Sequence, residues 1–297
     1  MQPVPRLMKI IRTAQSMAAW SERLRREGVT IGFVPTMGAL HDGHRSLIRA
    51  ARLRCDALAV SIFVNPSQFS PTEDLSTYPR PIARDRVLCR EEGVDVCFEP
   101  TVQAMYPQGF QTTVTVPALA HRWEGAARPH HFTGVATVVT KLFGMVRPHL
   151  AFFGQKDYQQ AALVRQLVDD LHLGVAIQVR QTVRERDGLA MSSRNIYLSP
   201  DERRVAHLLL QALRAGQQVI KGGTSDVAAI ERIMCQTIQQ APTIHAEYLA
   251  VCDQDSLEPL SIVADRAVLL GAVRIGSIRL IDNLLVRMPG GTSRATR

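Results

Sequence analysis

The sequence predicts an α/β protein with a parallel sheet, followed by a second, smaller α+β domain. Two observations support this prediction. Continuously apolar runs such as 57–64 alternate with segments of helical apolar spacing, which is typical of strands buried on both faces of a parallel sheet. Beyond residue 187 the order changes to helical segments followed by three strand-like runs, which indicates a separate α+β unit.

The first domain is placed at 1–186 and the second at 187–286. In the first, apolar spacing and stop signals predict helices over 10–28, 44–54, 82–92, 135–146 and 158–171. Strands are predicted between them at 29–34, 57–64, 94–98, 151–153 and 175–183, and 101–131 is expected to be irregular. In the second, helices are predicted at 201–216 and 225–240, and strands at 247–252, 267–273 and 275–282. Residues 287–297 are rich in Gly, Ser, Thr and Arg and are predicted to form a disordered tail.

Composition and charge narrow the class of protein. The 297 residues are 46% hydrophobic and 21% charged, as in an ordinary globular protein. The net charge of +8 comes mostly from scattered arginines, and the basic runs at 23–26 and 294–297 are not interleaved with aromatics. We interpret them as solvated surface and expect no nucleic-acid partner. The first twenty residues contain no apolar stretch long enough for a signal peptide or membrane span, so we expect a cytoplasmic protein with no membrane partner.

The most informative stretch runs from Val34 to His44 and reads VPTMGALHDGH. An apolar strand, a Gly-containing turn and a helix start follow one another, so backbone N–H groups and the positive end of the helix dipole point at one place. Gly38 and Gly43 allow close backbone approach. His41 and His44 are three residues apart, so both imidazoles can face the same phosphate and donate hydrogen bonds as its charge grows.

Two other stretches offer charge for phosphate oxygens. Lys156 is the first charged residue after a buried strand and turn, where it can act as a point charge, although a surface lysine has the same signature. The run Met191–Arg194 offers hydroxyls from Ser192 and Ser193 and the guanidinium of Arg194, a possible lid over a triphosphate. As an isolated tetrapeptide it is equally consistent with an ordinary surface loop.

Uncharged amides suggest where a small polar acid binds. Gln68 and Gln160 can hold hydroxyl and carboxylate oxygens, and Asn65 follows a strand at the edge where ligands of parallel sheets bind. Each is also consistent with a surface or turn residue. Asp85, on a predicted helix, can help to hold Mg²⁺ through water or be merely solvated.

Several common kinds of site have no support in the sequence. No His/Cys cluster has zinc spacing, and no Gly-x-Ser-x-Gly elbow is present, so metallohydrolase and serine esterase readings lack support. A Walker loop is also missing, which weighs against γ-phosphoryl transfer.

At this point the residues resemble a known family. The histidine stretch is similar to the HxGH signature of the nucleotidyltransferase superfamily, and its longer form PTMGALHDGH resembles the pantothenate synthetase family. Further matches follow in family order: SIFVNPSQF at 61–69, YPR at 78–80, FGQKDYQQ at 153–160, DGLAMSSRN at 187–195 and RLIDN at 279–283. The resemblance implies a Rossmann-like nucleotidyltransferase domain, a homodimer, and ligation of (R)-pantoate to β-alanine with ATP and Mg²⁺, through a pantoyl adenylate.

The resemblance also implies roles for individual residues. The catalytic set would be His41, His44, Lys156, Ser192, Ser193 and Arg194. The ATP site would be lined by Met37, Gly38, Ala39, Leu40, His41, Asp42, Gly43, His44, Gly154, Gln155, Lys156, Asp157, Val183, Met191, Ser192, Ser193 and Arg194. Pantoate would be held by Gln68, Gln160 and Asn65, and Mg²⁺ by Asp85. The chain departs from the family at Arg84, where a second acidic residue is common, and at His130 and Thr133, where Gly and Arg are common.

Two alternatives stay open at this stage. The chain can be another nucleotidyltransferase of the HxGH type, such as a cytidylyl- or adenylyltransferase, which dependence on pantoate would distinguish. From a different class, it can be an inactive nucleotide- or RNA-binding protein that uses its basic surface, which tight polyanion binding without AMP release would indicate.

Overall fold

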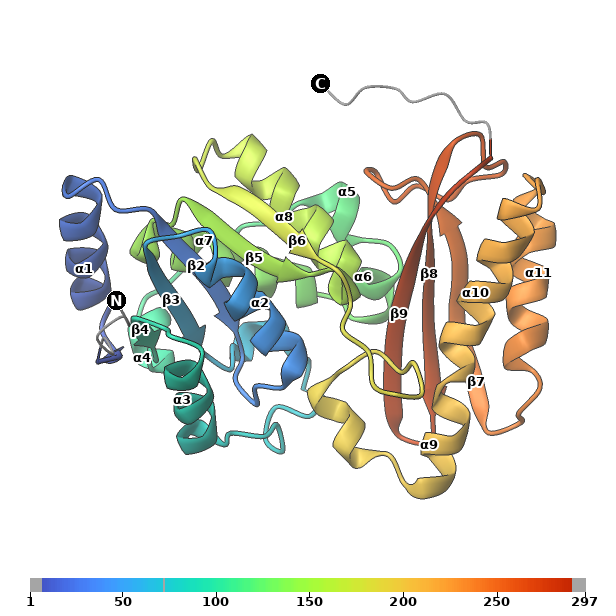
Figure 1. Ribbon diagram of the computed structural model, residues 1–297, viewed down its shortest axis with the longest axis horizontal. Coiled ribbons are helices and arrows are strands. Elements are labelled where there is room, and N and C mark those ends of the chain that lie inside the picture. Colours follow the sequence, from blue (N-terminus) through green and yellow to red (C-terminus); the bar gives the residue numbers. More distant parts are fainter. Residues whose placement is uncertain (1–6, 72, 290–297) are drawn as a thin grey trace. The chain divides into compact units, whose positions relative to one another are not determined.

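The computed structural model describes residues 7–71 and 73–289 and divides into two compact units (Figure 1). The first comprises residues up to Gln155 together with Gln159–Val183, and the second comprises Lys156–Tyr158 and the chain from Arg184 onward. Within the described ranges, no helix is long and apolar enough to cross a membrane.

The first unit contains a six-stranded sheet in the order β1-β4-β3-β2-β5-β6, in which every pairing is parallel. Its strands are β1 (Lys9–Ile11), β2 (Ile31–Thr36), β3 (Ala57–Ile62), β4 (Val96–Phe98), β5 (Leu150–Gly154) and β6 (Ala176–Arg180). Its helices are α1 (Ala14–Arg26), α2 (Asp42–Arg52), α3 (Ile82–Glu91), α4 (Val102–Met105), α5 (Pro117–Ala120), α6 (Glu124–Ala127), α7 (His131–Val146) and α8 (Tyr158–Asp170). The predicted α/β class is confirmed.

Helices cover both faces of this sheet because consecutive strand residues point to opposite sides. In β2, Val34 belongs to the apolar cluster with Leu47 and Ile48 of α2. Its neighbour Phe33 instead meets Phe143 of α7 edge to face, with ring centroids 6.3 Å apart. The helices α2 and α7 therefore lie on opposite faces, and β2 is buried on both.

Strand β2 is also the point where the strand order reverses. Through α2 the chain passes from β2 to its neighbour β3, whereas β5 pairs on the other side of β2. Since all these strands are parallel, the segments that follow β2, β3 and β5 leave from one edge of the sheet. Ligands of open α/β sheets bind at this edge, next to the strand where the order reverses.

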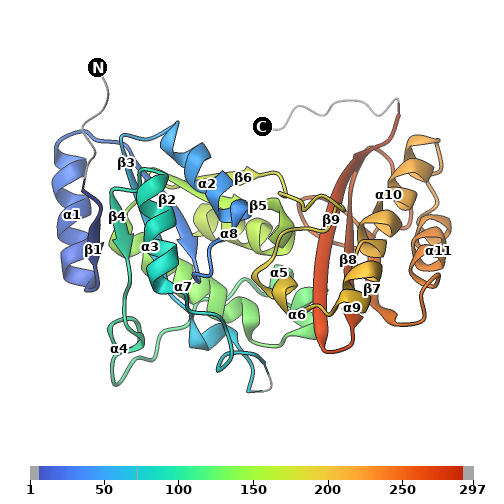
Figure 2. The same cartoon turned by 60° about the horizontal axis from the view of Figure 1, so that its bottom comes forward.

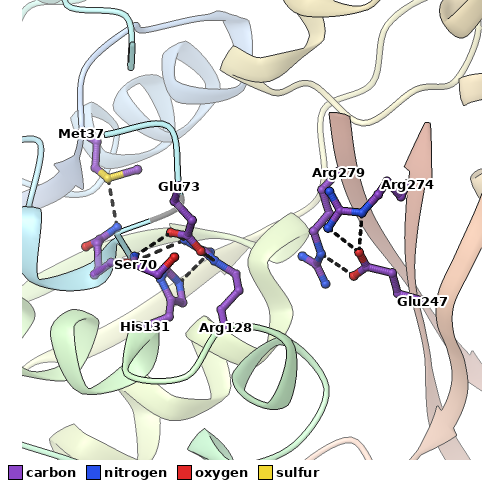
Figure 3. Close-up of polar contacts among 9 residues, drawn as sticks. Met37, Ser70, Glu73, Arg128, His131, Glu247, Arg274 and Arg279 are labelled. Carbon is purple, nitrogen blue, oxygen red and sulfur yellow. Dashed lines mark hydrogen bonds and ion pairs between the residues drawn. The ribbon is translucent and has the colours of Figure 1, made fainter. Parts of the chain in front are cut away.

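The second unit is a three-stranded antiparallel sheet covered by helices (Figure 2). It comprises α9 (Pro200–Ala206), α10 (Leu208–Lys221), α11 (Val227–Ile238), β7 (Ile244–Cys252), β8 (Arg266–Ile275) and β9 (Ile278–Arg287). Apolar side chains of α10 and α11, such as Leu213 and Ile230, share one core with Leu269 of β8. On the strands, Glu247 accepts hydrogen bonds from Arg274 and Arg279, which are paired across β8 and β9 (Figure 3).

Several predicted element boundaries were wrong. The helix predicted over 10–28 does not include Ile10 and Ile11, which belong to β1 (Lys9–Ile11). Helix α1 begins after Thr13, whose hydroxyl caps it by accepting from the N–H of Ser16. The expected irregular region 101–131 contains three short helices, α4 to α6. The single helix predicted over 201–216 is two, α9 and α10, which meet at His207.

The end of the chain also departs from prediction. The turn between β8 and β9 lies at Gly276, whose φ of +55° suits a tight hairpin, so Ile275 ends β8 instead of beginning β9. Arg287 is the last residue of β9, paired with Arg266, and is therefore not part of a tail. Met288 follows and donates its N–H to the carbonyl of Asp265, whereas residues 290–297 of that prediction lie outside the described residues.

Candidate active site

The turn after β2 is held in an unusual backbone conformation by a buried carboxylate. Gly38 and Ala39 have φ of +83° and +51°, and the latter is costly for a residue with a side chain. Asp85 of α3 accepts the N–H groups of Ala39 and Leu40 at 2.9 and 2.8 Å. Asp85 is only 1% exposed, and burial raises its pKa although these two N–H groups oppose the rise. Of the two alternatives that the sequence left open for Asp85, a merely solvated carboxylate is therefore wrong.

The two histidines form the N-terminal cap of α2. His41 Nδ1 accepts the N–H of Gly43 at 3.1 Å, and His44 Nδ1 accepts the N–H of His41 at 3.3 Å. The rings lie 4.2 Å apart between centroids. Because each Nδ1 accepts a hydrogen bond, the proton of each neutral imidazole is on Nε2. The cap thus fixes both tautomers as Nε2–H donors at a helix N-terminus, where anions are favoured.

Asn65 and Gln68 follow β3 in a short 3-10 turn, Pro66–Gln68, and belong to one hydrogen-bonded cluster with Met37. Asn65 donates from Nδ2 to Gln68 Oε1 at 3.1 Å and to the carbonyl of Gly134 at 3.2 Å. Gln68 donates from Nε2 to Met37 Sδ at 3.0 Å, which ties it to the turn after β2. Asn65 and Gln68 are 1% and 8% exposed, so neither is the solvated surface amide that the sequence left open.

The remaining candidates fall into two sets. In the first unit, Gly154 ends β5, Gln155 follows it, Gln160 lies in the first turn of α8, and Val183 ends the unit. The second unit contains a different set: Lys156, Asp157, Met191, Ser192, Ser193 and Arg194. Because the two sets belong to different units, their convergence around one ligand stays a prediction.

Within the second unit, the loop that carries Ser192–Arg194 is well anchored. Ser192 Oγ accepts the N–H of Arg194 at 3.3 Å, which begins a short 3-10 helix. Asn195 donates to Glu185 Oε1 at 2.6 Å and to the carbonyl of Ala190 at 3.1 Å. The loop therefore presents its hydroxyls and guanidinium from a defined backbone.

Two contacts next to the candidate residues do not follow from the sequence. The sequence leaves Asp85 as a possible Mg²⁺ contact or a solvated carboxylate, whereas its contacts show that it shapes the turn before the histidines. Asn283 donates from Nδ2 to the carbonyl of Lys156 at 2.9 Å. The run RLIDN at 279–283 was noted as a family match without a role, and its position was the only available signal.

A parallel α/β sheet whose central strand leads into an anion-favouring helix N-terminus is typical of nucleotide-binding enzymes. The family model described as pantoate-beta-alanine ligase matches residues 9–285. The chain is 49% identical over 281 residues to the pantothenate synthetase of Heliobacterium modesticaldum, covering 95% of this chain and 100% of that one. The chain therefore belongs to the pantoate-beta-alanine ligase family.

Solved structures agree with this assignment. The pantothenate synthetase of Thermus thermophilus superposes with a TM-score of 0.89 at 46% identity, covering 93% of this chain and 99% of that one. The pantoate-beta-alanine ligase of Francisella tularensis, solved with beta-gamma ATP and beta-alanine, gives 0.77 at 34% identity over 94% and 97%. The expected family, fold class and ligase activity are confirmed.

Proposed function

We propose that this chain joins (R)-pantoate to β-alanine and converts ATP to AMP and pyrophosphate through a pantoyl adenylate. The observation that carries the proposal is membership of the family over nearly the whole chain. The imidazole-capped start of α2, at the point where the strand order reverses, supplies the matching geometry. The Francisella relative supports it further, since its structure was solved with beta-gamma ATP and beta-alanine together.

Two displacements make up the reaction. An oxygen of the pantoate carboxylate attacks the α-phosphorus of ATP, a new P–O bond forms, and the bond to the bridging oxygen breaks so that pyrophosphate leaves. The neutral amine of β-alanine then attacks the acyl carbon, the bond to the AMP oxygen breaks, and the nitrogen loses a proton. Activation is needed because a free carboxylate is a poor acylating agent at neutral pH, and water must be kept from the mixed anhydride.

The predicted site residues have two kinds of role: some stabilise phosphate charge and others position the substrates. We assign His41 and His44 as donors from Nε2 to phosphate oxygens, a role that their Nδ1 contacts support. Lys156, Arg194, Ser192 and Ser193 would offset the charge that accumulates on the phosphates. The nucleotide would further contact the rest of the predicted set: Met37, Gly38, Ala39, Leu40, Asp42, Gly43, Gly154, Gln155, Asp157, Val183 and Met191. Gln68 and Gln160 would hold pantoate, and Asn65 would fix the amide of Gln68.

Asp85 does not by itself make a metal site. Both of its oxygens already accept backbone N–H groups, and no group of three His, Cys, Asp or Glu suited to a metal was found in the described ranges. Mg²⁺ usually keeps several waters and is held mainly by substrate phosphates. We therefore assign the cation to the triphosphate, where it would neutralise phosphate charge, and we assign Asp85 to the turn that faces it.

The proposal is tested by an AMP-release assay in which pantoate, β-alanine and ATP are each omitted in turn. We expect pyrophosphate to be released when pantoate and ATP are both present, and AMP and pantothenate to form only with all three substrates. Isotope exchange between pyrophosphate and ATP should require pantoate and proceed without β-alanine, because the first displacement is then reversible. Exchange with another acceptor, and none with pantoate, would favour a different nucleotidyltransferase.

A second experiment tests the histidines separately from the cap. Gln at the third helical position is a normal capping residue, so His44→Gln keeps an acceptor for the N–H of His41 while it removes the imidazole. We expect His44→Gln and Lys156→Ala each to lower adenylation by about two orders of magnitude, as loss of one charge-stabilising donor does. The controls are His245→Ala and Lys221→Ala, both exposed. Near-normal rates in both test variants would contradict the assignment.

We further propose that the enzyme works as a homodimer, as the family resemblance implies, and that it is cytoplasmic and bound to neither nucleic acid nor membrane, as its composition and first twenty residues suggest. Sedimentation at several protein concentrations should give twice the chain mass of 32.9 kDa. A monomer with full activity would contradict the dimer.

A further inference from the structure

A chain of hydrogen bonds in the first unit ends on the backbone of Gln68. It begins at Glu73, which accepts from Nε and Nη2 of Arg128 at 2.8 and 3.0 Å (Figure 3). Arg128 Nη1 lies 3.2 Å from His131 Nε2, and His131 Nδ1 lies 2.8 Å from the carbonyl oxygen of Gln68. Arg128 is the C-cap residue that follows α6, and His131 is the first residue of α7, so three segments of the chain meet here.

The partners of His131 determine the direction of these bonds. Arginine has only donors, so Nε2 of His131 must accept from it, which leaves the proton of the neutral ring on Nδ1. That N–H then donates to the Gln68 carbonyl. The neutral form is also favoured by burial and by the nearby Arg128 charge, which together lower the pKa of His131 to about 4.

The charges of Glu73 and Arg128 neutralise each other, so neither is directed at a ligand. Although burial opposes it, the hydrogen bond and charge of Arg128 lower the pKa of Glu73, so the pair is ionised and neutral overall. The Arg128 and Glu73 side chains are 19% and 22% exposed, so the pair is partly protected from water. Four contacts, two to Glu73 and one each to His131 and Gln68, use most of the donors of Arg128. The arrangement is therefore suited to holding a backbone in place.

The backbone of Gln68 is also packed tightly against α7. A Cβ on Gly134 of α7 would lie 2.7 Å from the Gln68 Cα, so the first turns of α7 and this loop are in direct contact. Since Asn65 holds the side-chain oxygen of Gln68 and His131 holds its carbonyl, the residue is fixed at both ends. An amide that orients a substrate acid loses effectiveness with displacements of about 1 Å.

We propose that Glu73, Arg128 and His131 form a positioning triad. The triad fixes the backbone of Gln68 so that its side-chain amide is correctly placed for the hydroxy acid substrate. This inference rests on the function proposed above, in which Gln68 contacts pantoate. The triad acts through Gln68 and is distinct from the histidine cap of α2, so its loss should change acid binding more than nucleotide binding.

The test compares two substitutions of His131. In His131→Asn, the amide nitrogen takes the place of Nδ1 and can still donate to Gln68, whereas His131→Ala has no donor. We expect His131→Ala to raise KM for pantoate about tenfold, the effect of one buried hydrogen bond, with KM for ATP changed less than about twofold. His131→Asn should recover most of the loss. His121→Ala, at an exposed histidine of the same unit, is the matched control.

The possible results distinguish failure of the proposed function from failure of the proposed triad. If the wild-type protein forms no AMP with pantoate, β-alanine and ATP all present, the proposed function is wrong; if it is active and His131→Ala leaves KM for pantoate unchanged, only the triad is wrong. Equal rises in KM for pantoate and ATP, or equal effects of Ala and Asn, also overturn the triad. Should His131→Ala fail to fold, Glu73→Gln carries the same test, with an expected rise of about threefold.

Discussion

The loop of Gln68 and the turn of Lys156 are both stabilised by contacts from distant segments, but by different means. Gln68 is held at its side chain by Asn65 and at its carbonyl by His131. Lys156 is anchored at its backbone carbonyl by Asn283, while its Nζ lies 3.5 Å from Oδ1 of the adjacent Asp157. Nearby, Tyr158 donates from its hydroxyl to the carbonyl of Gln254 at 2.8 Å.

This difference follows from the chemistry of the two side chains. An amide must point both its donor and its acceptor correctly, so it depends on a rigid backbone and a fixed rotamer. A lysine ammonium is a point charge on a flexible stem, and it reaches an anion if its backbone is roughly in place. We therefore expect small displacements to be costly at Gln68 and mild at Lys156.

Among substitutions that test this comparison, Gly134→Ala is expected to have the largest effect on activity. The added Cβ would lie 2.7 Å from the Gln68 Cα and against the backbone of Ser67, so the loop must move. We expect kcat/KM for pantoate to fall by about a hundredfold or more, since displacements near 1 Å cost that much, together with a lower Tm.

The same helix offers a matched control for that change. Gly144 of α7 has nothing within 4 Å of its added Cβ, and Gly→Ala in a helix normally stabilises by about 0.5–1 kcal/mol. Gly144→Ala should keep full activity with an equal or higher Tm. If Gly134→Ala were as active and stable as Gly144→Ala, the close packing of α7 on the Gln68 loop would be refuted.

A smaller loss of activity is expected for Asn283→Asp, which alters the turn of Lys156. The substitution keeps the shape of the side chain, removes the N–H that bonds the carbonyl of Lys156, and places a carboxyl at a position that is only 1% exposed. We expect kcat to fall about tenfold, with KM for pantoate nearly unchanged, because one hydrogen bond to the backbone is lost.

The control for Asn283 is Gln217→Ala. Gln217 also donates an amide hydrogen bond to a backbone carbonyl, that of Leu285 at 2.9 Å, but at an exposed site. It should have wild-type kinetics. A fall in kcat/KM for pantoate in Asn283→Asp as large as in Gly134→Ala would show that Lys156 needs the same accuracy as Gln68, and the comparison would fail.

The sequence predicted the parts of this molecule that depend on local pattern. The buried strand over 57–64 and the strand, turn and helix around His41 follow from apolar runs, glycines and a helix start, and these are present. The anchors depend instead on pairs far apart in the chain. Asp85 and Ala39, or Asn283 and Lys156, meet only through the fold, so no spacing in the sequence reveals them.

The short strand β1 was not predicted, for the same reason. Lys9–Ile11 is only three residues long, and its isoleucines also fit the helical spacing that follows. It is a strand because Val96–Phe98 lies beside it as a parallel partner. Local pattern cannot supply such a partner, because pairing between distant segments depends on tertiary context.

The smallest expected effect is a dependence of stability on pH. It should arise at the Gln68 loop and not at the Lys156 turn, because only the anchors of Gln68 include a histidine. His131 has a pKa near 4 in the folded protein against about 6.5 when unfolded, and Arg128, Glu73 and Glu124 are the charged groups that influence it. As pH falls below 6.5 the unfolded chain takes up the proton first, so stability is lost over the window from 6.5 towards 4. By pH 6 this amounts to about 1 kcal/mol in the free energy of unfolding. Chemical denaturation at pH 7.5 and pH 6 should show the loss in the wild type and a smaller loss in His131→Asn, which has no titrating ring; equal losses in both would show that His131 is not neutral at this position.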